Sequence, residues 1–510
     1  PVKISWSSEA PLKRASFTAV SNIIRAVISF YTVIILAKSL GPLDYGRMTF
    51  LLSTFIAIKS LLDMGTSSAF FTFLSRKRMS FYFVRNFWLW VLLQFLISLI
   101  VVGFILPQSS IEAIWKGETR LLVILALIAV FMQFTVWPIA SQMAEASREN
   151  IKVQKVNLLT TCFHSSIIVF LASNESISLK VIFCVILIEW SLAGFIVSRF
   201  YKYNISDYHV QTSDDVSSNK VFRSFILYCL PFIPYVWLGF ASEFADRWIL
   251  QSFGGAVEQA YFSIGLQFAS IALIATASVV KIFWKEVAEL NENGHVEEIK
   301  NFFLISSRSI FIFTALLGCY LVPCSEYIIV SLLGNDYING SFALSVLFIY
   351  PIHQSLGQIS STIFLAIGLT TSYVVIGCFH CIVSIIIAYI VVAPNDAIVP
   401  GLGLGSKGLA IKMIVVQFIS VNCYQYWLSK KLSIKYDFSF QLFWIINFII
   451  IGYVSKYIIE NILTINIGNI SDQMIFFTSY TSIYLTFIYV LFKILNIDLV
   501  ERLKFIRSKY

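Results

Sequence analysis

The amino-acid sequence predicts an all-α, polytopic membrane protein. Of its 510 residues, 58% are hydrophobic and 13% are charged, whereas soluble domains contain roughly 45–50% apolar and about 25% charged residues. The mean hydropathy is +0.80. Most apolar runs are close to the ~20 residues that a membrane-spanning helix requires, and runs such as Val91–Ile105 lack the alternating polarity of barrel strands. These observations exclude an ordinary cytosolic enzyme, a nucleic-acid-binding protein and a disordered chain.

Charged or turn-rich segments divide the hydrophobic sequence into about fourteen predicted transmembrane helices. Their approximate bounds are 16–38, 48–74, 86–106, 121–143, 157–172, 179–198, 222–245, 258–280, 301–325, 342–366, 372–393, 403–428, 438–458 and 474–493. No loop between them approaches the ~50 residues of a small folded domain. The activity is therefore expected within the membrane or at its rim.

The distribution of Lys and Arg predicts how these helices are oriented. With the N-terminus inside, the inward segments contain 24 Lys and Arg residues and the outward loops contain eight. Because positive residues concentrate in cytoplasmic loops, both termini are expected in the cytoplasm. The net charge of +9 is spread over the whole chain, so no nucleic acid is expected as a partner.

A faint internal repeat follows the first helix of each predicted half. Leu36–Phe50 resembles Ile249–Ile264, and one inserted residue aligns Gly41 with Gly254 and Gly46 with Ala260. Both halves begin on the same side of the membrane, so the repeat is expected to be parallel. Paired repeats in transporters often enclose a central binding site.

Several short motifs occur along the chain in a fixed order. They are Leu40–Gly46 (LGPLDYG), Leu61–Ala69 (LLDMGTSSA), Leu230-Pro231 with Ala245–Arg247 and Phe253-Gly254, and Leu332–Tyr337 (LLGNDY). This ordered set resembles the bacterial oligosaccharide and O-antigen flippases of the Wzx type, whose superfamily also holds lipid II flippases and multidrug antiporters. One departure is Gly255, which stands where the second turn of the family usually has Pro.

The resemblance implies two six-helix lobes around a central cavity, residues 1–200 and 222–428, with two additional helices in 438–493. It implies alternating access that moves an undecaprenyl-pyrophosphate-linked oligosaccharide, the O-antigen repeat unit, across the bacterial inner membrane. The protein would be a monomer and not an enzyme. Its partners would be the lipid-linked oligosaccharide, membrane lipid, and the polymerase and chain-length proteins of the same pathway. The alternatives are a multidrug or cation antiporter of the superfamily and an O-antigen polymerase or ligase.

Ionisable side chains within the predicted spans are candidates for function because each is costly in hydrocarbon. An excess of cations suits a pyrophosphate-linked substrate, since Lys and Arg form charge-assisted hydrogen bonds with phosphate oxygens. The candidate substrate-binding cations are Arg25, Lys59, Arg308 and Lys412. Three acidic residues are candidates for ion coupling or internal pairing, namely Asp63, Glu189 and Glu243.

Sequence spacing shows which of these candidates have a possible charge partner on the same helix. Lys59 and Asp63 lie four residues apart on one helix and can pair. Arg25 and Lys412 have no acidic partner nearby in sequence, which makes them the stronger substrate-binding candidates. The segment Gly401–Gly408 lacks the GK[ST] order of a phosphate-binding loop and is expected to begin a helix. No nucleotide, other cofactor or metal is therefore expected, and an ion gradient or the substrate itself remains as the energy source.

Overall fold

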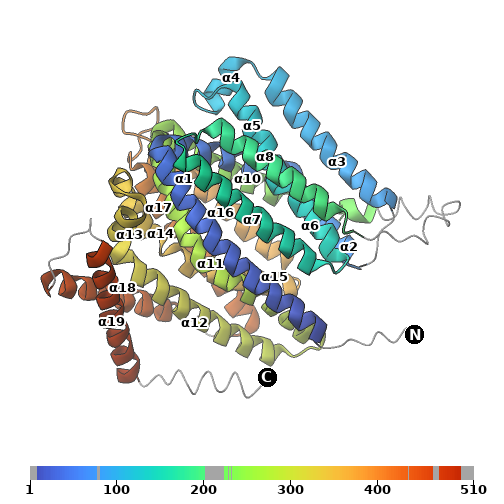
Figure 1. Ribbon diagram of the computed structural model, residues 1–510. Helices are drawn as coiled ribbons and strands as arrows, with labels where there is room; N and C mark the ends of the chain where they lie inside the picture. The colour runs from blue at the N-terminus through green and yellow to red at the C-terminus, as the bar shows by residue number, and fades with distance from the viewer. Residues whose placement is uncertain are drawn as a thin grey trace. The chain divides into compact units, whose positions relative to one another are not determined.

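A computed structural model describes residues 9–76, 81–201, 223–227, 229–230, 233–434, 436–462 and 470–495 (Figure 1). These residues form helices and contain no β-strand, which confirms the predicted all-α membrane fold. The α-helices are α1 (Glu9–Asp63), α2 (Thr66–Arg76), α3 (Phe81–Ile100), α4 (Gln108–Ile114), α5 (Arg120–Phe131), α6 (Trp137–Ala146), α7 (Asn150–Ser173), α8 (Leu179–Ser198), α10 (Ile233–Phe253), α11 (Gly255–Glu292), α12 (Val296–Leu321), α13 (Ser325–Leu333), α14 (Ser341–Leu347), α15 (Tyr350–Ala366), α16 (Thr370–Val392), α17 (Gly405–Leu432), α18 (Phe438–Ile462) and α19 (Ile470–Ile494).

The predicted spans coincide with these helices, with a few joined or divided. Helix α1 contains the first span and most of the second, joined through a kink at Gly41. A π-helical turn, Met132–Val136, connects α5 to α6 within the fourth span. Residues 222, 228, 231 and 232 of the seventh span lie outside the described residues. Within the described part of the chain, ten helices are long and apolar enough to cross a membrane.

The chain divides into two compact units. Unit 1 comprises Pro1–Ser263 and Val374–Lys412, and unit 2 comprises Ile264–Tyr373 and Met413–Tyr510. In unit 1, α1 packs along α7 and α10, and α8 packs on α5 and α6 (Figure 1). Its core includes a stacked pair of rings, Phe70 and Phe87, whose centroids are 3.8 Å apart. The division into two six-helix lobes stays a prediction.

Two glycines of unit 1 lie in the segments that the sequence comparison relates. Gly41 and Gly255 both have positive φ, +69° and +79°, at turns that follow the first and the seventh predicted helix. Glycine adopts such a φ without the steric cost of a side chain. Pairing these two glycines would align Gly46 with Ala260 without an inserted residue. The repeat itself, with its pairing of Gly41 and Gly254, stays a prediction.

Close backbone contact explains the second glycine of the first turn. A Cβ atom on Gly46 would lie 1.7 Å from the carbonyl oxygen of Ala256. Any side chain at position 46 would push the beginning of α11 away from α1. In the LGPLDYG segment, Gly41 therefore permits the turn and Gly46 permits the close approach of α11.

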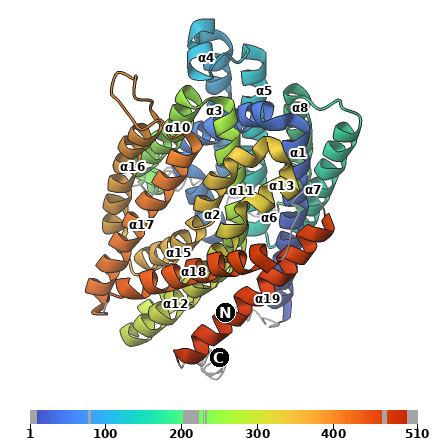
Figure 2. The same ribbon diagram turned by 90° about the vertical axis from the view of Figure 1, so that its left-hand side faces the viewer.

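Unit 2 is organised around α12, which packs on α15 and α18, while α19 packs on α18 (Figure 2). Tyrosine hydroxyls connect α19 to the backbone of α12. Tyr480 donates to the carbonyl of Tyr320 at 2.8 Å, and Tyr484 donates to that of Leu316 at 3.0 Å. Hydrogen bonds between helices contribute to association where lipid supplies no hydrophobic driving force between them. These contacts attach the last helix of the chain to unit 2.

Candidate functional site

The predicted charged residues lie in local polar clusters within each unit. Lys59 and Asp63 lie at a cavity of unit 1. Lys412 lies in a network with α10 in the same unit, and Arg308 lies at a cavity of unit 2.

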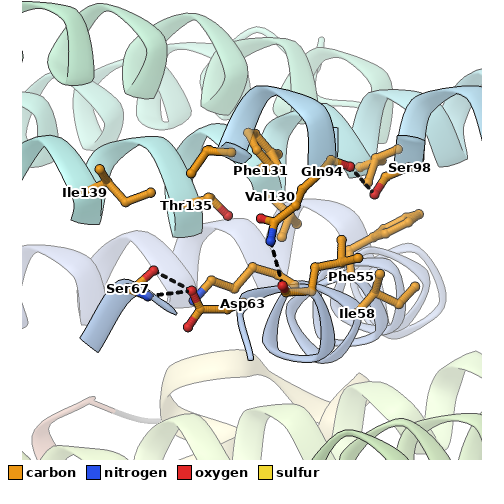
Figure 3. A pocket seen from close by; sticks show the side chains of 14 residues that line it. Phe55, Ile58, Asp63, Ser67, Gln94, Ser98, Val130, Phe131, Thr135 and Ile139 are labelled. Carbon is orange, nitrogen blue, oxygen red and sulfur yellow. Dashed lines mark hydrogen bonds between the residues drawn. The ribbon is translucent and has the colours of Figure 1, made fainter. Parts of the chain in front are cut away.

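The cavity of unit 1 has an empty volume of about 430 Å³ and is surrounded by α1, α2, α3, α5, α6 and the π-helical turn between α5 and α6. Its walls are mostly apolar, as Figure 3 shows for Phe55, Ile58, Val130 and Phe131. The polar groups around it are Lys59, Asp63, Ser67, Gln94, Ser98 and Thr135. Mostly apolar walls with a few polar groups are typical of ligand sites.

Asp63 is held in place as a helix cap. It is the last residue of α1 and accepts hydrogen bonds from the backbone N–H of Ser67 at 3.0 Å and from the Ser67 hydroxyl at 2.5 Å (Figure 3). The hydroxyl of Thr66 donates to the same carboxylate oxygen at 3.2 Å. The break at Met64 and Gly65, both with positive φ, turns the chain so that the carboxylate meets the backbone N–H of Ser67 in the first turn of α2. A carboxylate at this position satisfies N–H groups that the helix leaves unpaired.

Lys59 has no comparable partner. The structure shows no ion pair between Lys59 and Asp63, and Lys59 forms no hydrogen bond with any other described residue. The i,i+4 spacing permits a pair, but the carboxylate is already used by α2. The ammonium of Lys59 is therefore available to an anion in the cavity.

The second cluster joins α10 to α17. Lys412 Nζ lies 2.7 Å and 2.6 Å from the two carboxylate oxygens of Asp246. The Lys412 side chain is 4% exposed and that of Asp246 is 24% exposed. Sequence inspection found no acidic partner near Lys412, whereas the fold supplies one 166 residues away. Lys412 is thus a neutralised, buried cation.

Neighbours of Asp246 extend this network. Arg247 donates to the hydroxyl of Ser263 at 3.0 Å and lies over the ring of Phe262. Glu243, one turn earlier on α10, is exposed and forms no hydrogen bond within the described chain. Glu243 remains the acidic candidate that is open to a cation or proton.

The remaining predicted residues, Glu189 and Arg25, differ in their hydrogen-bond partners. Glu189 on α8, whose side chain is 2% exposed, lies 2.7 Å from Nδ1 of His164 on α7. One carboxylate oxygen of Glu189 is thus paired within unit 1, while the other, Oε1, is buried without a hydrogen-bond partner. Arg25 is half-buried on α1, with Ser21 buried one turn before it, and forms no hydrogen bond or ion pair with a described residue.

Arg308 is paired across unit 2. Its guanidinium donates to the carboxylate of Asp437, which precedes α18, and it lies 5.3 Å from the ring centroid of Phe440. Both side chains line a cavity of about 470 Å³.

Sequence analysis missed a charged cluster beside the kink of α1. Arg47 donates to both carboxylate oxygens of Glu118, at 2.7 and 2.8 Å, and to Asp44 at 2.8 Å. Nearby, Lys116 lies over the ring of Trp248 at 4.2 Å, and desolvation lowers the pKa of its ammonium. The i,i+3 spacing of Asp44 and Arg47 could have indicated that these two residues pair. Glu118 lies 71 residues from Arg47, so no local spacing indicates that it belongs to the cluster.

Solved structures that share this fold include transporters and a flippase. One is the lipid II flippase MurJ in an inward closed conformation, with a TM-score of 0.68, 16% identity, and coverage of 94% of this chain and 99% of that chain. A second is an inward-facing multidrug resistance MATE family transporter of the MOP superfamily. Its TM-score is 0.56 at 15% identity, and the match covers 81% of this chain and 98% of that chain. A third is a MOP superfamily transporter from Pyrococcus furiosus. Its TM-score is 0.54 at 14% identity, and the match covers 83% of this chain and 96% of that chain.

The sequence matches no family model and no curated protein. At these low identities the structural likeness establishes the fold alone. The described chain therefore has the fold of MurJ and of the MATE and MOP transporters, and the substrate has to be inferred from its own residues.

Proposed function

We propose that this protein is a flippase that moves an undecaprenyl-pyrophosphate-linked oligosaccharide from the cytoplasmic to the periplasmic leaflet of a bacterial inner membrane. The observation that carries the proposal is the extent of the match to a lipid II flippase, 94% of this chain. The MATE family transporter and the MOP superfamily transporter from Pyrococcus furiosus are covered almost completely, yet they match only 81% and 83% of this chain. The difference corresponds to about the length of two spanning helices, which supports a lipid-linked substrate over a small soluble one.

The free cations support an anionic group on that substrate. Lys59 lines the cavity of unit 1 without an acidic partner, and Arg25 has none on the same helix. Charge-assisted hydrogen bonds from such groups would hold a pyrophosphate, and the apolar walls would strengthen them by excluding water. Lys412 and Arg308, which are paired with acids, would contribute less than the sequence alone predicts.

The mechanism needs a change of access, because the polar sugar has to cross hydrocarbon while the prenyl chain stays in lipid. Rocking of two lobes around a central cavity would expose the substrate first to one side and then to the other. The positive-inside distribution supports cytoplasmic termini. No nucleotide-binding motif occurs in the sequence, so an ion gradient or the substrate gradient would drive the cycle, and Glu243 is the candidate ion-coupling residue.

Genetic complementation tests the proposal. The chain is expressed in bacteria that lack their own O-antigen flippase, in strains that make repeat units of different sugars, with membrane abundance matched between variants. Restored surface polysaccharide in at least one strain is expected for the wild-type chain. Normal membrane insertion with no restoration in any strain, combined with newly acquired drug resistance, would favour the antiporter alternative.

A further inference from the structure

A short segment between α3 and α5 packs against the kinked helix α1. It comprises residues 107–119 and contains α4. We call it the outer strap, since the charge distribution assigns it to the outward side of the membrane. At its base, the guanidinium of Arg120 donates to the backbone carbonyls of Gly103 and Leu106, at 2.6 and 2.7 Å. These hydrogen bonds tie the two ends of the outer strap together.

Two contacts fasten the outer strap to α1. The ring of Trp115, which is 2% exposed, stacks on Phe55 with the centroids 5.3 Å apart. The carboxylate of Glu118, whose side chain is 5% exposed, accepts two hydrogen bonds from Arg47 at 2.7 and 2.8 Å. A bidentate pair of this kind is strong and geometrically specific, and breaking it would leave a buried carboxylate without its partner. The outer strap is therefore a fixed part of the α1 side.

A third contact joins the tip of the outer strap to α10. Lys116 and Gly117, with positive φ of +51° and +84°, form the turn at this tip. The ammonium of the exposed Lys116 lies 4.2 Å from the ring centroid of Trp248. By sequence α10 belongs to the second predicted half, whereas in the structure it packs on α1 within unit 1. An exposed cation over an aromatic face is held more weakly than a buried bidentate ion pair. The contact with Trp248 is thus the one that yields when α10 moves away from α1.

The backbone beside these side chains is also in close contact. A Cβ atom on Gly46, next to Arg47, would lie 1.7 Å from the carbonyl oxygen of Ala256 at the beginning of α11. No side chain interlocks at position 46, so nothing there would hinder separation of the two segments. The side chains of the outer strap therefore supply the specific contact at this end of unit 1.

We propose that the outer strap is an outward-side latch, fixed to α1 and closing reversibly on α10 through Lys116 and Trp248. The proposal rests on the alternating access of the proposed function and adds the contact that has to open. Outward opening would separate Lys116 from Trp248, while the pair of Arg47 and Glu118 stays in place. The latch is closed in the structure described.

Accessibility of a cysteine on α10 tests the latch without any substrate. The eight free cysteines are replaced, and Ser252→Cys, half-buried on α10 one turn after Trp248, is labelled from outside with an impermeant maleimide. Lys116→Gln is expected to accelerate the labelling about threefold, as loss of a cation–π contact would. Lys38→Gln, at an exposed position of α1, is the matched control and should leave the rate unchanged. Equal labelling rates with Lys116 and with Lys116→Gln would refute the latch.

Cross-linking tests whether the contact has to open during transport. In the same cysteine-free chain, Lys116→Cys with Trp248→Cys is joined by a short bifunctional thiol reagent, and so is the control pair Arg47→Cys with Glu118→Cys. Transfer of a lipid-linked oligosaccharide in proteoliposomes is compared with that of each variant before cross-linking. The reagent is expected to abolish transfer by the first pair and to leave transfer by the control pair unchanged.

The outcomes separate the latch from the proposed function. Transfer that continues after complete cross-linking of positions 116 and 248 would refute the latch and leave the flippase proposal standing. Equal inhibition of both pairs would show that the outer strap also has to leave α1, which contradicts its fixed attachment. Absence of transfer by the wild-type protein would refute the proposed function, and the labelling of Ser252→Cys would still decide the latch.

Discussion

The ammonium of Lys412 on α17 lies within 2.7 Å of both carboxylate oxygens of Asp246 on α10. Because the Lys412 side chain is 4% exposed and that of Asp246 is 24% exposed, removing either charge leaves the other largely buried without its ion-pair partner. This pair connects two segments of unit 1 that are far apart in sequence. It gives Lys412 a structural role that its position in the sequence does not reveal.

Removing one member of this pair should cost more than removing both. Lys412→Met is expected to lower the stability of the purified protein by about 3 kcal/mol because it leaves an uncompensated carboxylate. Lys412→Met combined with Asp246→Leu should recover most of that loss. Thermal unfolding in detergent, analysed as a double-mutant cycle, measures the coupling. Additive losses in the double variant would mean that the two charges do not interact.

Lys59 and Asp63 should behave in the opposite way, because no ion pair joins them. Lys59→Met is expected to abolish polysaccharide assembly with little change in thermal stability. Asp63→Ala removes the cap of α2 and should cost about 1 kcal/mol. The double variant should be as inactive as Lys59→Met and as unstable as Asp63→Ala. Restored activity in the double variant would show that Lys59 serves only to neutralise Asp63.

The contact between Gly46 and Ala256 predicts sensitivity to a single methyl group. Gly46→Ala places a Cβ atom 1.7 Å from a backbone oxygen, so the beginning of α11 must move, at a cost of about 3 kcal/mol. Gly239→Ala is the matched control, since nothing lies within 4 Å of its added Cβ, and it should leave stability unchanged or slightly higher. Equal melting temperatures for the two variants would contradict the close approach described for α1 and α11.

Arg25 tests the role of unpaired cations in the first helix. Arg25→Gln removes the charge and is expected to abolish surface polysaccharide, whereas Arg25→Lys keeps the charge without the planar fork and should retain part of the activity. Lys38→Gln, at an exposed position of the same helix, controls for loss of a charge and should be fully active. Complementation with matched membrane abundance is the measurement. Full activity of Arg25→Gln would remove this residue from the mechanism.

Hydrophobic length predicted the helices well, because every span has to cross the same thickness of lipid. The glycine-rich segment near residue 405 begins α17 as expected, since its spacing was wrong for a phosphate loop. Charge partners were less predictable. Local spacing can indicate neighbours on one helix, such as Asp44 and Arg47, but the partners Asp246 of Lys412 and Asp437 of Arg308 come from distant segments. The repeat stays a prediction, since Gly254 and Gly255 are identical in sequence and only Gly255 of the two has a positive φ.

Translocation by the purified protein tests the central claim most directly. The chain is reconstituted into proteoliposomes that contain the undecaprenyl-pyrophosphate-linked repeat unit of a strain it complements, initially accessible from one side only. Access of an impermeant glycosidase added to the other side then reports on movement of the sugar. We predict transfer of the oligosaccharide that Lys59→Met abolishes and Lys38→Gln preserves. Transfer no faster than in protein-free vesicles, with both variants correctly folded and inserted, would contradict the assignment as a flippase.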